Sequence, residues 1–67
     1  MLVRPMNKIE KANAKLLKDN GFTIFWEFNG PNKGDYWAIH PKLIAQYHVA
    51  TKCNRAIIDL RLVESNN

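Results

Sequence analysis

The sequence is poor in cysteine and has no long run of apolar residues. Its only cysteine, Cys53, excludes a disulfide within the chain, which is typical of a protein in a reducing compartment. No stretch approaches the roughly 18 consecutive apolar residues that a membrane-spanning helix needs. The start of the chain, Met1 to Pro5, also lacks the apolar run of a signal peptide. We therefore expect a soluble protein of the cytoplasm.

Side chains that carry chemistry are also sparse. His40, His48 and Cys53 are the only soft metal ligands, and the last two would lie about 140° apart around a helix. Such a set is too small for a structural zinc site. The carboxylates are scattered and form no evident acid pair: Glu10, Asp19, Glu27, Asp35, Asp59 and Glu64. The sequence predicts no catalytic residue, metal site or cofactor, and we do not expect an enzyme.

What the chain does contain is enough apolar material for one small domain. Its 67 residues are 46% hydrophobic, which is an ordinary composition for a folded core. We expect residues 1–67 to form a single domain, with 1–6 and 64–67 as flexible ends. Basic residues exceed acidic ones by 10 to 6. The resulting charge of +4 favours acidic partners without selecting nucleic acid over protein.

The segment 8–20 carries the signals of a helix. Asn7 is a good N-cap, Glu10 stands where a capping box needs a carboxylate, and Gly21 can end the helix in a left-handed conformation. One arc of this helix gathers apolar side chains, with Ala12 at its edge. The members of this arc, which we expect to face the core, are Met6, Ile9, Leu16 and Leu17.

After this first helix, the sequence predicts two strands, a second helix and a third strand. Residues 22–28 and 35–39 are rich in β-branched and aromatic residues and flank a loop with strong turn chemistry, so they predict a hairpin. Pro41 could open a helix over 41–53, although a strand through 47–49 stays open. Alternation over 56–63 predicts a last strand. We expect an α+β two-layer sandwich of order α-β-β-α-β, with a three-stranded, mainly antiparallel sheet and two helices on one face.

Such a sheet would leave one face open for a partner. Its outward side chains should include aromatic and charged residues suited to a protein interface. We assign partner binding to four of them: Phe25, Glu27, Tyr36 and Arg61. If the last strand lies at the edge of the sheet, it could also pair with a second copy and form a homodimer.

A second candidate surface is a row of lysines on the first helix. The spacing of Lys8, Lys11, Lys15 and Lys18 places them on one side of the helix, and only Lys15 has an acid, Asp19, four residues away. Together with Lys33 in the hairpin loop, this row could bind a phosphate backbone. The simpler interpretation is the solvated side of an amphipathic helix.

These features favour a small non-enzymatic regulator or inhibitor that binds a protein partner. Compact proteins of this kind carried by phages and mobile elements would fit. The alternative is a small basic nucleic-acid-binding protein that uses the lysine row.

Overall fold

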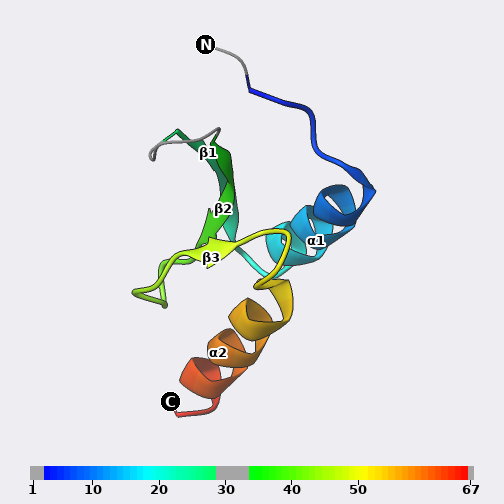
Figure 1. Ribbon diagram of the computed structural model, residues 1–67. Helices are drawn as coiled ribbons and strands as arrows, with labels where there is room; N and C mark the ends of the chain where they lie inside the picture. Colours follow the sequence, from blue (N-terminus) through cyan, green and yellow to red (C-terminus); the bar gives the residue numbers. More distant parts are fainter. Residues whose placement is uncertain (1–2, 29–33, 67) are drawn as a thin grey trace.

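The computed structural model of the protein describes residues 3–28 and 34–66 (Figure 1). It has five elements in the order α-β-β-β-α. Their bounds are α1 Lys8–Asp19, β1 Thr23–Glu27, β2 Asp35–Ile39, β3 Tyr47–His48 and α2 Cys53–Ser65. The strands form one antiparallel sheet in the order β1-β2-β3. The α+β class and the three-stranded antiparallel sheet are thus confirmed.

Helix α1 has the predicted ends. The Asn7 side chain accepts a hydrogen bond from the Glu10 backbone N–H at 2.7 Å, and the Glu10 carboxylate accepts one from the Asn7 backbone N–H at 3.0 Å. At the other end Gly21 has φ 91°, and the Phe22 N–H donates to the Leu17 carbonyl at 3.0 Å. Both ends therefore have their backbone groups paired by local sequence signals.

The buried side of α1 differs from the predicted apolar arc. Leu17 is fully buried as expected, together with Ala14 and Glu10, but Ile9 is 63% and Leu16 44% exposed. The helix is turned so that Glu10 faces inward, where the Arg4 guanidinium neutralises it with two contacts of 2.6 Å. A buried charge that is fully paired can take a core position that periodicity alone gives to an apolar residue.

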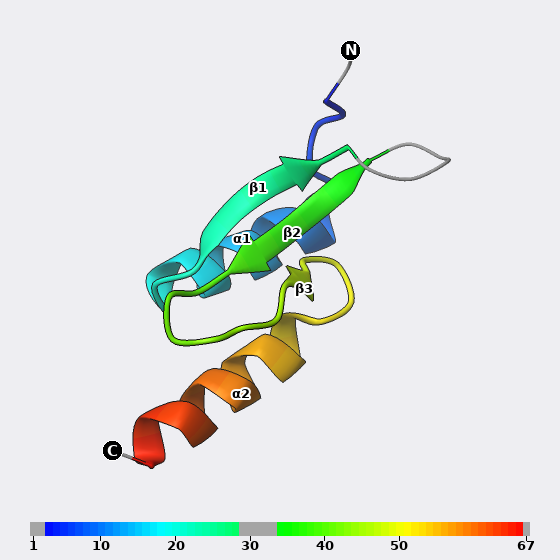
Figure 2. The same ribbon diagram turned by 90° about the vertical axis from the view of Figure 1, so that its left-hand side faces the viewer.

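The sheet lies against α1 with one face only. Figure 2 shows the strands in front and α1 behind them, and within the described residues no helix covers the front face. The side chains of the covered face include the fully buried Ala38, its cross-strand partner Ile24 on β1 and its other partner Tyr47 on β3. The predicted open face of the sheet is therefore present.

The predicted order of the second half of the chain is wrong. The expected helix over 41–53 is a turn followed by β3, because the Tyr47–His48 segment pairs with β2 and the Val49 N–H donates to the Tyr36 carbonyl at 3.1 Å. The backbone N–H of Lys42 donates to His40 Nδ1 at 3.0 Å, which fits a turn at Pro41 rather than a helix start.

The expected strand over 56–63 is the middle of α2. Its buried residues Cys53, Ala56 and Leu60 follow a helical spacing, whereas Ile58 and Leu62 of the predicted alternation are exposed. Helix α2 contacts α1 and β3 and continues through Ser65. The edge strand that we expected to form a homodimer at 56–63 therefore does not exist.

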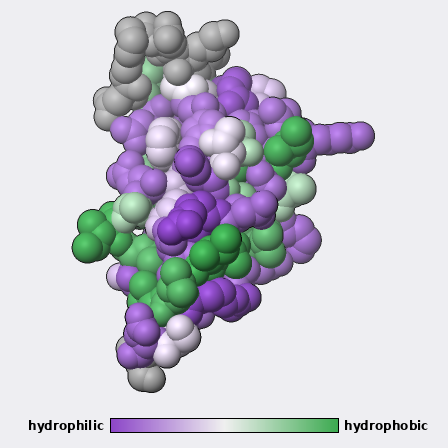
Figure 3. Space-filling view, turned by 60° about the horizontal axis from the view of Figure 1, so that its bottom comes forward, coloured by the Kyte–Doolittle hydropathy of each residue, from purple (hydrophilic) through white to green (hydrophobic). Residues whose placement is uncertain are grey.

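Apolar side chains also gather on the outside of the molecule near α2. Figure 3 views this end, and hydrophobic surface lies over α2 and over the segment before β3. None of the helices among residues 3–28 and 34–66 has the length and apolar character of a membrane span.

Candidate protein-binding face

The open face of the sheet carries one row of rings across all three strands. Phe25 on β1 pairs with Trp37 on β2, and Trp37 pairs with His48 on β3. These positions alternate with the residues that face α1, so their side chains lie on the opposite face. The Trp37 and His48 rings meet edge to face, with centroids 5.2 Å apart. All three side chains are half-buried, which leaves part of each ring accessible.

Aliphatic side chains extend this row toward the end of the sheet where the chain leaves β2. Ile39, the last residue of β2, is on the same face as Trp37 and is 40% exposed. The loop from 40 to 46 then projects to the side of the sheet away from α1 (Figure 1). Ile44 in this loop is fully exposed. We use the name aromatic face for the three rings together with these two isoleucines: Phe25, Trp37, Ile39, Ile44 and His48.

Polar contacts hold the β3 end of the aromatic face in place. His48 Nε2 lies 2.5 Å from Asp35 Oδ2, and His48 Nδ1 lies 2.9 Å from the Thr51 hydroxyl. Asp35 Oδ1 accepts hydrogen bonds from Arg4 at 2.7 Å and from the Tyr36 backbone N–H at 2.9 Å. The imidazole is therefore fixed from both of its nitrogens, and its ring in turn supports Trp37.

The charge state of Asp35 follows from these contacts. Partial burial alone would raise the pKa of this carboxyl, but the contact with His48 and the Tyr36 N–H hydrogen bond bring it below its usual value. Asp35 is thus an anion at neutral pH. Its two oxygens connect the N-terminal segment, through Arg4, to the aromatic face, through His48.

The structure brings together only part of the predicted partner-binding set. Phe25 and Glu27 lie on the open face. Tyr36 does not lie on the open face as predicted: its ring contacts the Trp26 ring on the covered side, with centroids 4.9 Å apart, and its hydroxyl donates to the Arg4 carbonyl at 2.5 Å. Arg61 is not on the sheet as predicted, because it lies on α2, where it pairs with Glu64 at 3.7 Å.

Sequence reasoning missed Trp37, Ile39 and His48. The available signal was Ala38, because a small side chain between larger ones is suited to the crowded face under a helix. Fixing Ala38 inward places Trp37 and Ile39 outward by alternation. No comparable signal marked His48, since a two-residue strand exists only through its pairing with β2.

The lysine row lies on a different side of the molecule. Lys8, Lys11, Lys15 and Lys18 are all exposed on α1, which covers the opposite face of the sheet. A shallow groove of about 330 Å³ runs along this flank, lined by Met6, Lys11, Ala14, Lys15, Lys18 and Asp19. Lys33, the remaining member of the predicted nucleic-acid site, lies outside the described residues.

Neither ligand chemistry nor similarity identifies the site further. Among residues 3–28 and 34–66, no three His, Cys, Asp or Glu side chains are grouped so that they could hold a metal ion. Comparisons of the chain with protein-family models, with curated proteins and with solved structures found no significant match.

Proposed function

We propose that this protein is a small non-enzymatic regulator or inhibitor of the cytoplasm that binds a protein partner through its aromatic face. The observation that carries the proposal is the row of three partly exposed rings across the strands, together with the fully exposed Ile44 in the loop that follows β2. Aromatic side chains are enriched at the centres of protein interfaces, where they supply most of the binding energy. Full burial of an isoleucine side chain is worth about 1.5–3 kcal/mol, so covering Ile44 would itself favour association.

The charge of this face favours a protein over a nucleic acid. The three strands contain no lysine or arginine, and they carry the carboxylates Glu27 and Asp35. A platform that stacks nucleic-acid bases also needs positive charge to follow the phosphates. Apolar rings with acidic residues at one end are better suited to a protein surface with a basic rim.

The rigidity of the face supports the same function. Phe25 and Trp37 are held in the antiparallel ladder, and His48 is fixed by Asp35 and Thr51. Because these rings are already ordered, binding a partner would cost little of their side-chain entropy. Proteins of this size commonly act by occupying a surface of a larger one, which needs no catalytic group.

Affinity capture with matched variants tests this function. Trp37→Thr and Ile44→Ser remove apolar contact area from the aromatic face, and Ile58→Ser removes an exposed isoleucine side chain from α2. Capture is carried out from nuclease-treated lysate of the native host, after circular dichroism has confirmed that each variant is folded. We expect Trp37→Thr to weaken binding of the retained partner by about 30-fold, the effect of losing one aromatic anchor.

The control variant Ile58→Ser shows whether any loss of binding is specific to the aromatic face. Ile58→Ser should retain the same partner with unchanged affinity. If the partner binds the Trp37 and Ile44 variants as tightly as it binds the parent, the aromatic face is not the binding surface and the proposal is wrong.

A further inference from the structure

The outer edge of β1 is the longest free strand edge of the described sheet. Among residues 3–28 and 34–66, β1 has five residues and β2 as its only strand neighbour, whereas β3 has two residues and contacts α2. A free edge presents N–H and C=O groups to which another extended chain can add.

The backbone groups of Ile24 and Trp26 point to this free edge. In an antiparallel ladder, alternate residues direct both of their backbone groups to opposite sides. The Val49 N–H donates to the Tyr36 carbonyl, so the backbone of Tyr36 faces β3 and the next residue of β2 faces β1, where its partner is Phe25. The neighbours of Phe25 on β1 therefore face outward, and among the described residues no further backbone hydrogen bond reaches them.

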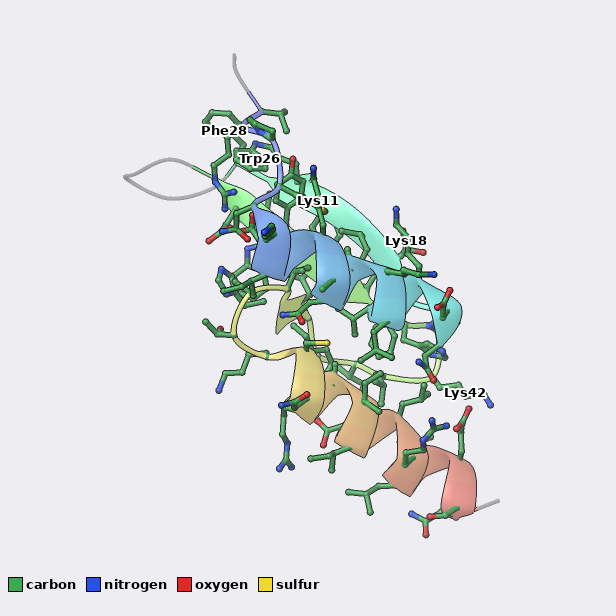
Figure 4. All side chains as sticks on the ribbon, turned by 90° about the vertical axis from the view of Figure 1, so that its right-hand side faces the viewer. Lys11, Lys18, Trp26, Phe28 and Lys42 are labelled. Carbon is green, nitrogen blue, oxygen red and sulfur yellow. The ribbon has the colours of Figure 1, made fainter. Side chains whose placement is uncertain are left out.

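Lysines of α1 lie beside the same edge. Figure 4 shows Lys11 and Lys18 extending from α1 to the side where β1 lies. Within the described part of the chain, Lys8, Lys11 and Lys18 make no ion pair, and Lys15 pairs with Asp19 only at 3.7 Å in an exposed contact. The groove along these residues therefore has an excess of positive charge, and it lies on α1, the helix that packs against β1.

We infer that the free edge of β1 and the lysine flank of α1 together bind an extended acidic segment of another protein. The segment adds as a fourth strand, and its backbone pairs with the N–H and C=O groups of Ile24 and Trp26. Alternate side chains of such a strand point to the α1 side about 6.7 Å apart. The rise from Lys11 to Lys18 along the helix is about 10.5 Å, so acidic residues at successive alternate positions can reach these lysines.

A second copy of the chain is a poor occupant of this edge. Antiparallel pairing of β1 with its own copy about a two-fold axis places both α1 helices on the same face of the joined sheet. The lysine flank of each copy would then face the flank of the other, and like charges would oppose the contact. An acidic segment has the complementary charge and meets no such repulsion.

A nucleic acid would use only half of the site. Phosphates can meet the lysines, but the edge of β1 also presents the carbonyl oxygens of Ile24 and Trp26, which repel phosphates. An extended polypeptide satisfies donors and acceptors alike. The edge chemistry therefore favours a peptide, and binding of nucleic acid at the lysines is an alternative outcome of the test.

The test uses a short blocked peptide in which aspartate and valine alternate, titrated into the full-length protein at low salt and followed by NMR. A peptide of the same composition with its aspartates clustered at the two ends is the sequence control. We expect the alternating peptide to bind more tightly than the clustered one and to slow hydrogen exchange of the Ile24 and Trp26 amides. The amide of Phe25, already paired with β2, should change much less.

Two matched double variants separate the lysine flank from net charge. Lys11→Gln with Lys18→Gln removes two charges beside β1, whereas Lys42→Gln with Lys52→Gln removes two exposed charges elsewhere (Figure 4 marks Lys42 at the far end). We expect about a fivefold loss of peptide affinity in the first variant, as for two exposed ion pairs, and no loss beyond general screening in the second. Trp37→Thr should leave peptide binding unchanged, so this inference and the proposed function can fail separately.

Three results would overturn the inference. The first is equal binding of the two peptides without protection of the Ile24 and Trp26 amides, which would mean attraction by charge alone. The second is an oligouridylate that binds the lysine flank while the alternating peptide does not, which would assign the surface to nucleic acid. The third is no binding of either probe.

Discussion

Replacement of Glu10 by glutamine should destabilise the protein strongly for a change of one atom. Glu10 is only 1% exposed, and its carboxylate accepts two hydrogen bonds from Arg4 at 2.6 Å and one from the Asn7 backbone N–H at 3.0 Å. A glutamine has one acceptor oxygen, and its NH2 group opposes the donors of the guanidinium. The variant therefore loses at least one charged hydrogen bond at a buried position.

The size of the effect follows from these contacts. A hydrogen bond to a charged group contributes about 1.5–3 kcal/mol, and because Arg4 can be partly rehydrated we expect Glu10→Gln to cost about 2 kcal/mol. The whole free energy of unfolding of a domain of this size is about 3–10 kcal/mol. The melting temperature should therefore fall by about 8–16 °C, measured by circular dichroism at neutral pH. Glu64→Gln, which changes an exposed carboxylate, is the control and should shift it by only a few degrees.

The pH dependence gives a second and sharper readout. Hydrogen bonding to Arg4 lowers the pKa of Glu10 below its usual 4.5, against the opposing effect of burial. Since the unfolded protein takes up this proton more readily than the folded one, the contribution of Glu10 is complete above about pH 4.5 and is lost as the pH falls through the folded pKa. The difference in melting temperature between parent and variant should thus be constant near neutrality and shrink in acid. An equal melting temperature at neutral pH, or a difference that grows in acid, would refute this reasoning.

Two further predictions concern the backbone and the buried thiol. Gly21→Ala should lower the urea midpoint by an amount equivalent to about 1–2 kcal/mol, because Gly21 has φ 91° and an added Cβ would lie 3.0 Å from His40 Nε2; an unchanged midpoint would contradict this. Burial raises the pKa of the Cys53 thiol, so iodoacetamide should modify Cys53 slowly in the native protein and rapidly in urea. Equal rates of modification in the two conditions would show that the thiol is accessible in the folded state.

The parts of the fold that could be predicted are those with local signals. The capping residues Asn7 and Gly21 gave the ends of α1, and the aromatic runs on either side of the turn gave β1 and β2. These signals lie within a few residues of the structure that they specify. They needed no knowledge of what packs against them.

The second half of the chain failed because its structure depends on distant contacts. Ile58, Leu60 and Leu62 alternate as a strand would, yet only Leu60 is buried, since the Cys53, Ala56 and Leu60 side of α2 faces the core. Periodicity over so short a run of apolar residues fits a helix and a strand alike. β3 depends entirely on its pairing with β2, and no local sequence pattern predicts this contact.

The candidate site shows the same division. The sequence placed Phe25 and Glu27 on the open face, because the alternation of β1 is unambiguous. It placed Tyr36 there by a shift of one residue, which exchanges every side chain of β2 between the two faces. The small side chain of Ala38 was the sequence signal that could have decided between Tyr36 and Trp37, and the structure shows that Ala38 is fully buried.

The two edge strands of the sheet, β1 and β3, differ in length, and this difference affects how the protein can assemble. β3 has only two residues and contacts α2, so an added strand could form few backbone hydrogen bonds there, whereas β1 has five residues. Open-ended addition of copies of this chain would need two usable edges in each copy, so that the β3 edge of one copy could pair with the β1 edge of the next, and the short β3 edge does not provide this. Such a geometry favours one-to-one complexes and works against the open-ended stacking that leads to fibrils.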